Sequence, residues 1–221
     1  MKLTIFAATG RIGAHVVEQA LAAGHDVTAV VRNPGNVAAD VRTVAADLSA
    51  PDATVLESAV SGADAVISCL GPRRRADAGI TAPGTRAIVS AMKAGGVRRL
   101  VVVSAAPVGT VPSPGRPNPP RHDPGDGFFM RHLAGPMIKV VLRSHYADLA
   151  VMEDVLRESG LDWTVVRPPR LTDGPRTGRY RTAFGQNLRG GTHVSRADVA
   201  DLMLASLDRA ETIGKSIGIA H

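Results

Sequence analysis

Residues 7–13, which read Ala-Ala-Thr-Gly-Arg-Ile-Gly, are the first segment of the chain whose residue types and spacing could do chemistry. They lie between an apolar run typical of a strand and a pattern typical of a helix, so the glycines can form a sharp turn that exposes the first N–H groups of the helix. Such N–H groups bind phosphate at the positive end of the helix dipole. The residues expected to hold a pyrophosphate are Thr9, Gly10, Arg11, Ile12 and Gly13. A tight turn without a ligand is the alternative.

The residue that follows the second expected strand indicates which dinucleotide would fit. An acidic side chain at that place would bind the ribose 2′-hydroxyl of NAD(H). The chain has Arg32 there instead, and a guanidinium can bind a 2′-phosphate through paired, charge-assisted hydrogen bonds. Arg11, exposed at the turn, could bind the same phosphate from the other side. We therefore expect NADP(H) to be preferred over NAD(H), unless Arg32 is merely a surface charge.

The elements that position these residues follow from apolar runs rich in Val and Ile that alternate with helical patterns. Strands are expected over 2–8, 26–31, 41–46, 63–70, 99–104 and 162–167. Helices are expected over 11–23, 51–60, 85–94, 128–143, 146–158 and 195–208, the last with Ser195 as its N-cap. The stretch between 170 and 194 reads as irregular, and the residues after 208 as a short tail. The pattern predicts an α/β fold: a Rossmann-type, doubly wound parallel sheet with helices on both faces.

The length of 221 residues is within the usual range of one domain. We therefore expect a single NAD(P)-binding domain over 1–221. Residues 107–145, with six prolines between 107 and 120, and residues 170–194 interrupt the repeating pattern. They are expected to be insertions that cover the substrate crevice at the carboxyl edge of the sheet.

Composition bounds the partners and the compartment. No apolar run reaches the roughly 18 residues that a membrane span needs, the first residues lack the plan of a signal peptide, and Cys69 is the single cysteine, so a cytoplasmic protein with no membrane contact is expected. The net charge is +6, but aromatic residues are only 3% and the arginines are mostly scattered, which argues against nucleic acid. The histidines lack metal-ligand spacing, so no metal site is expected. A small-molecule substrate and a monomer or homodimer are expected.

Five segments, 9–13, 31–33, 46–48, 64–71 and 156–168, resemble the atypical short-chain dehydrogenase/reductases. Within that group the chain is most similar to NmrA-like NAD(P)-binding proteins and to biliverdin-IXβ/flavin reductases. The resemblance covers nearly the whole chain and is weakest over 107–145. It implies that the adenine and the rest of the cofactor are lined by Asp47, Leu48, Leu70, Gly71 and Arg73. It implies that the nicotinamide is bordered by Ser104, Pro168, Pro169 and Arg170.

The chain departs from the family pattern at three places. Ala7 stands where the turn usually has its first glycine, and Arg170 stands where the flavin-reductase pattern has a histidine. No Tyr-x-x-x-Lys pair exists, because Tyr146 is followed four residues later by Ala150. The missing lysine argues against carbonyl reduction by a tyrosinate–lysine relay.

Three residues are candidates for the chemistry itself. Ser104 could donate a hydrogen bond or only satisfy backbone at its strand end. Tyr146 could face the site, although a surface position for it and for its neighbour His145 is the alternative. Arg170 could bind an anionic substrate or the cofactor carboxamide, or could be a solvated loop residue.

These observations favour an NAD(P)H-dependent oxidoreductase, of the NADPH-dependent reductase type, that transfers a hydride to a small conjugated acceptor such as a flavin, quinone or enone. An acceptor with an electron-deficient ring needs little acid from the protein, which fits the missing relay. Two alternatives stay open: a non-catalytic NAD(P)-binding redox sensor, and an epimerase or isomerase that recycles its cofactor.

Overall fold

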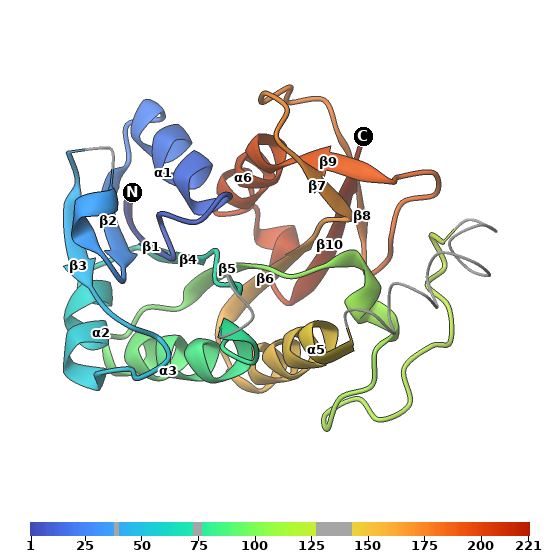
Figure 1. Cartoon of the computed structure of the whole chain (residues 1–221), viewed down its shortest axis with the longest axis horizontal. Coiled ribbons are helices and arrows are strands. Elements are labelled where there is room, and N and C mark those ends of the chain that lie inside the picture. Colours follow the sequence, from blue (N-terminus) through green and yellow to red (C-terminus); the bar gives the residue numbers. More distant parts are fainter. Residues whose placement is uncertain (38–39, 73–76, 127–142) are drawn as a thin grey trace.

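The computed structural model describes residues 1–37, 40–72, 77–126 and 143–221. Its main sheet has the strand order β3-β2-β1-β4-β5-β6-β10-β8 (Figure 1). The strands are β1 Lys2–Phe6, β2 Asp26–Val31, β3 Arg42–Ala45, β4 Ala65–Ser68, β5 Arg99–Val103, β6 Asp162–Arg167, β8 Arg181–Phe184 and β10 Lys215–Ala220. All neighbours are parallel except β10 and β8. A second, small parallel sheet pairs β7 Arg170–Thr172 with β9 His193–Ser195.

Helices cover both faces of the main sheet. The α-helices are α1 Gly13–Ala22, α2 Ala53–Val60, α3 Thr81–Ala94, α5 Arg143–Glu158 and α6 Arg196–Ala205, and the short 3-10 turns are η1 Pro34–Asn36, η3 Ala106–Thr110 and η5 Ala210–Thr212. Helices α1 and α6 lie on one face, and α2, α3 and α5 lie on the other (Figure 1). Strand β5 serves both cores, because Val101 and Val103 pack toward α1 and α6 while Leu100 and Val102 pack toward the other three helices. The predicted doubly wound α/β sheet is confirmed.

Two expectations about the last third of the chain were wrong. The stretch 170–194 is not irregular, since it contains β7, β8 and part of β9, and the short tail contains β10, which pairs with β6 and with β8. These strands are only three to six residues long and depend on distant partners, so local periodicity could not find them. The expected N-cap is confirmed, because the Ser195 hydroxyl accepts a hydrogen bond from the Asp198 N–H.

Helix α3 begins at Thr81, four residues earlier than expected. Asp148 of α5 explains the difference, because its carboxylate accepts the Thr81 and Ala82 N–H groups at 2.9 and 3.0 Å. A carboxylate suits the positive end of a helix, and Pro83 is tolerated in the first turn. Most of the expected helix 128–143 lies outside the described residues.

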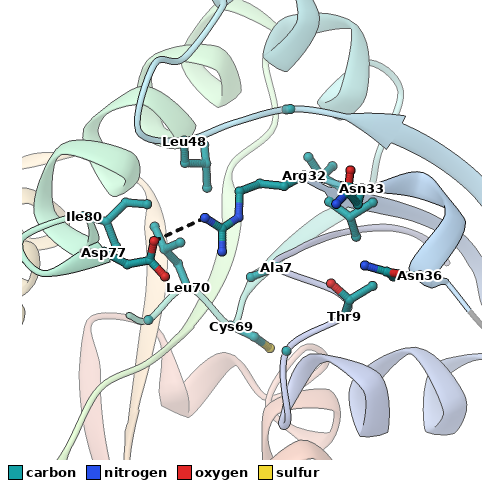
Figure 2. Close-up of a pocket in the computed structure, with 15 residues that line it drawn as sticks. Ala7, Thr9, Arg32, Asn33, Asn36, Leu48, Cys69, Leu70, Asp77 and Ile80 are labelled. Carbon is teal, nitrogen blue, oxygen red and sulfur yellow. Dashed lines mark hydrogen bonds and ion pairs between the residues drawn. The ribbon is translucent and has the colours of Figure 1, made fainter. Parts of the chain in front are cut away.

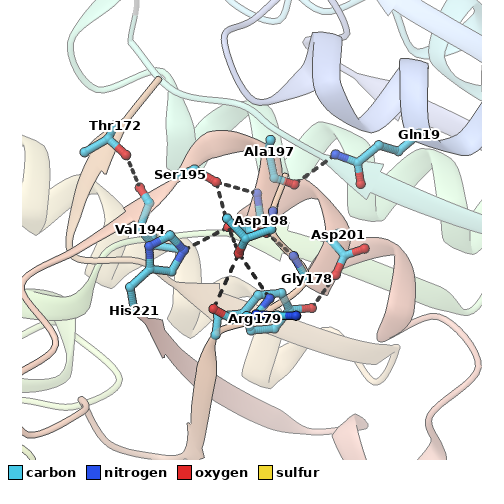
Figure 3. Close-up of polar contacts among 12 residues, drawn as sticks. Gln19, Thr172, Gly178, Arg179, Val194, Ser195, Ala197, Asp198, Asp201 and His221 are labelled. Carbon is cyan, nitrogen blue, oxygen red and sulfur yellow. Dashed lines mark hydrogen bonds and ion pairs between the residues drawn. The ribbon is translucent and has the colours of Figure 1, made fainter. Parts of the chain in front are cut away.

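Asp198, which is fully buried, links the start of α6 to two segments that are distant in sequence (Figure 3). Its carboxylate accepts the Ser195 hydroxyl at 2.9 Å, the Thr177 and Gly178 N–H groups at 2.8 and 2.9 Å, and lies 2.8 Å from the His221 ring. Burial alone would raise the pKa of Asp198, but these bonds outweigh it and hold the pKa at about 2.

The low pKa of Asp198 predicts an acid-sensitive contribution to stability. Because the pKa is below its unfolded value, the contribution is present above about pH 4 and is lost as the pH falls toward 2, and it amounts to about 2 kcal/mol. Urea unfolding at pH 5 and pH 2.5 should show a smaller loss of unfolding free energy for Asp198→Asn than for the wild type. Equal losses for both proteins would contradict this assignment.

Candidate functional site

The turn between β1 and α1 has the geometry that its glycines predict. The Gly10 N–H donates to the Ala7 carbonyl at 2.8 Å, and α1 begins three residues later. A Cβ on Gly13 would lie 2.3 Å from that same carbonyl oxygen, and one on Gly10 would lie 3.0 Å from it. The helix therefore packs against the end of β1 only because glycine occupies position 13. Within its first turn, the Ala14 and Val16 N–H groups donate to the Gly10 and Ile12 carbonyls at 2.9 and 3.0 Å, so a phosphate would be bound by the other N–H groups of this turn. A turn of this geometry could hold a pyrophosphate.

Ala7 has a backbone φ of +55°, and no other described residue except glycine has a positive φ. An alanine in this conformation costs roughly 1–2 kcal/mol, because its Cβ approaches the following carbonyl. The chain thus keeps the turn that glycine would allow, with strain at the floor of the site.

A pocket of about 420 Å³ opens beside this turn, at the carboxyl ends of β1, β2 and β4 (Figure 2). Six of the predicted cofactor residues line it: Thr9, Gly10, Arg32, Leu48, Leu70 and Gly71. Asp47 lies next to the pocket but is not part of its lining, and Arg73 lies outside the described residues.

The charges in this pocket are paired. Arg32 reaches into the pocket and donates a hydrogen bond to Asp77 at 3.2 Å. Asp77 was not among the residues predicted from the sequence. The Asp47 carboxylate instead accepts the Ser49 N–H and hydroxyl at 2.9 and 2.8 Å. These two bonds hold the pKa of Asp47 below its usual range, and the charge of Arg32 adds to the effect.

Arg11 has a different neighbourhood from Arg32. Its exposed guanidinium pairs with Asp173 at 2.5 Å, and the same carboxylate binds Arg196 at 2.6 Å. Asp173 follows β7, so this contact joins the turn between β1 and α1 to residues 170–194, which were expected to be an insertion. In this arrangement Arg11 does not line the pocket that holds Arg32.

A second pocket, of about 680 Å³, lies at the carboxyl ends of β5, β6 and β10. It is lined by the four predicted residues Tyr146, Pro168, Pro169 and Arg170. Both interrupting segments contribute, since residues 107 and 125–126 form one part of the wall and residues 187–188 and 190–192 form another. Because the strands of both pockets are parallel neighbours, the two pockets share one edge of the sheet.

Tyr146 and His145 point to different surroundings, as expected for adjacent residues on a helix. Tyr146 is buried and lines the second pocket, whereas His145 does not line it. Burial raises the pKa of the Tyr146 phenol, so the hydroxyl keeps its proton at neutral pH. Burial also lowers the pKa of His145, which favours the neutral ring.

Ser104 is buried behind the second pocket and does not line it. Its hydroxyl donates to Glu153 at 2.8 Å, and Glu153 is also bound by both Nε and a terminal nitrogen of Arg167. Arg167 does line the pocket, so the buried pair supports the wall. Sequence reasoning missed Glu153 and Arg167. The available signal was the helical spacing of Glu153, seven residues after Tyr146, which puts both on one face of α5.

A family model described as NAD(P)H-binding matches residues 7–210. The chain belongs to this NAD(P)H-binding family. The match begins at Ala7, directly after β1, and it confirms the NAD(P)-binding family that the resemblance implies.

The individual proteins that this chain resembles are only distantly similar to it in sequence. Rv2047c of Mycobacterium tuberculosis is 34% identical over 106 residues, which cover 48% of this chain but only 12% of the relative. A short-chain dehydrogenase/reductase from Veillonella parvula, solved in complex with NADP, has a TM-score of 0.77 at 20% identity and covers 100% of this chain and 94% of its own. ChuY, an anaerobillin reductase from Escherichia coli, has a TM-score of 0.76 at 22% identity, with coverages of 100% and 97%.

In the described part of the chain, no helix is long and apolar enough to cross a membrane.

Proposed function

We propose that this protein is an NADPH-dependent reductase that transfers a hydride to a small conjugated acceptor. The observation that carries the proposal is the pair of pockets on one sheet edge, one with a phosphate cradle and Arg32, the other with Tyr146 and Arg170. The first pocket has the features of a site for the adenosine half of the cofactor. The second has the size of a small-molecule site.

The similar structures support this proposal by what they are known to hold or do. The Veillonella parvula protein was solved with NADP, and ChuY is named as a reductase. The proposal treats residues 1–221 as one domain in which 107–145 and 170–194 cover the acceptor pocket. Residues from both segments line that pocket, which supports their assignment as its cover.

The bound cofactor would supply the hydride, and the residues of this chain would orient the acceptor. Pro168 and Pro169 give a rigid wall, and the Pro168 carbonyl is held by the Ala106 N–H at 2.9 Å. Exposed Arg170 can attract an anionic group on the acceptor, and the protonated Tyr146 phenol can donate a hydrogen bond or a proton to its oxygen. Glu153 and Arg167 hold the wall behind them.

Replacing Tyr146 by Phe tests whether the phenol hydroxyl donates a proton to the acceptor. We expect kcat for an enone, which needs a proton from the protein, to fall about 100-fold, because a positioned general acid contributes that much or more. Turnover of a flavin should change little, since its ring accepts the hydride without a protein acid. Steady-state assays with both acceptors measure this. Equal losses with both, or no loss with the enone, would remove Tyr146 from the role of proton donor.

The function itself is tested by NADPH oxidation with a panel of flavins, quinones and enones. The proposal predicts saturable oxidation with at least one class. Dinucleotide binding without oxidation across the whole panel would overturn it in favour of a sensor. Turnover of a sugar-type substrate without net loss of NADPH would overturn it in favour of an epimerase or isomerase.

A further inference from the structure

The Arg32–Asp77 pair is the feature of the first pocket that the cofactor assignment leaves unexplained. Arg32 directly follows β2, whereas Asp77 lies between β4 and α3, so the pair joins opposite walls. Figure 2 shows the Arg32 side chain extending across the pocket toward Asp77, with Leu48 and Leu70 nearby. The Asp77 side chain is 14% exposed and that of Arg32 is 45% exposed, so the carboxylate is the better shielded partner.

We propose that Asp77 is a specificity residue that competes with the 2′-phosphate of NADP(H) for Arg32 and accepts a hydrogen bond from the ribose 2′-hydroxyl of NAD(H). This inference rests on the proposed dinucleotide site. An acidic group that binds this hydroxyl commonly follows the second strand. Here Arg32 occupies that position, and Asp77 brings a carboxylate to it from the other wall.

The charges give the competition its direction. A phosphate monoester carries a charge of about −1.5 to −2 at neutral pH, so it gains from Arg32 but is repelled by a carboxylate that already holds the same guanidinium. NAD(H) has a neutral hydroxyl there and escapes this repulsion. Asp77 therefore reduces the advantage that Arg32 alone would give to NADP(H).

Asp47 is another carboxylate near this pocket, but the ion pair of Arg32 is with Asp77. Its oxygen is already bound by the backbone and hydroxyl of Ser49. Its pKa responds to both Arg32, which lowers it, and Asp77, which raises it, so the three charges act on one another. Asp77 is the group that contacts the guanidinium directly.

The test is calorimetric titration of the wild type and Asp77→Asn with NADP⁺ and with NAD⁺. Asparagine keeps the size of the side chain and removes its charge. We expect the ratio of the two dissociation constants to shift about tenfold toward NADP⁺, which corresponds to removal of one charge contact of about 1.4 kcal/mol. Asp77→Ala should shift the ratio in the same direction. Asp26→Asn, with the same change of charge at the opposite end of β2, should leave the ratio within about twofold of the wild type.

The outcomes separate this inference from the proposed function. If the wild type binds dinucleotide and neither Asp77 variant moves the ratio toward NADP⁺, the specificity role is overturned and the cofactor site stands. If the wild type binds neither dinucleotide, the proposed function and this inference are overturned together.

Discussion

Gly13→Ala should lose at least about tenfold in affinity for NADP⁺ and unfold more easily, by roughly 1–3 kcal/mol. The new Cβ would lie 2.3 Å from the Ala7 carbonyl oxygen and 3.0 Å from backbone atoms of Ala8, so α1 must move away from the end of β1. That movement would displace the N–H groups that are proposed to bind the pyrophosphate. Calorimetric titration measures the affinity, and urea unfolding measures the stability.

Gly35→Ala is the matched control for Gly13→Ala. It also adds one methyl group, but its Cβ would have no atom of the described residues within 4 Å, and its φ is not in the left-handed region. Binding and stability of this variant should be close to those of the wild type. A Gly13→Ala protein that is folded and binds NADP⁺ as tightly as the Gly35→Ala control would show that the cradle does not hold the pyrophosphate.

Arg32→Glu should weaken NADPH binding at least about 100-fold, because a charge-assisted contact is replaced by repulsion of the 2′-phosphate. NADH binding should change by about threefold or less, since its ribose hydroxyl does not depend on a cation. Arg42→Glu reverses a charge at the start of β3, away from the pocket lining, and controls for the change in net charge. Equal losses of NADPH and NADH in Arg32→Glu would mean that Arg32 is not the 2′-phosphate ligand.

Much of the fold and of the first pocket could be predicted because the signals are local. The Gly10 and Gly13 spacing is set within one turn, and Arg32 is placed by the end of a single strand. The alternation of apolar runs with helical patterns is equally local, and it gave β1 to β6 and the helices between them to within a few residues.

The remaining features depend on partners that are far apart in the sequence. Asp148 caps α3 from a helix 66 residues or more away, and Asp77 meets Arg32 across 45 residues. Strand β10 exists as a strand because β6 and β8 flank it, although its six residues carry little pattern of their own. No spacing rule predicts such pairs, since they arise only when the sheet is assembled.

Ser104 shows how a correct position can carry a different chemistry. It directly follows β5, which ends at Val103, one residue earlier than expected, and its hydroxyl donates to buried Glu153. Glu153 in turn binds Arg167, which lines the second pocket, so Ser104 contributes to the wall only indirectly. Tyr146, Pro168, Pro169 and Arg170, by contrast, line the pocket in which the acceptor is proposed to bind.

The most direct test of the account is a calorimetric titration of the wild-type protein with NADP⁺. Saturable binding of one dinucleotide per chain is the predicted result. No saturable heat up to about 1 mM, the upper end of usual enzyme affinities, would contradict the account at its base.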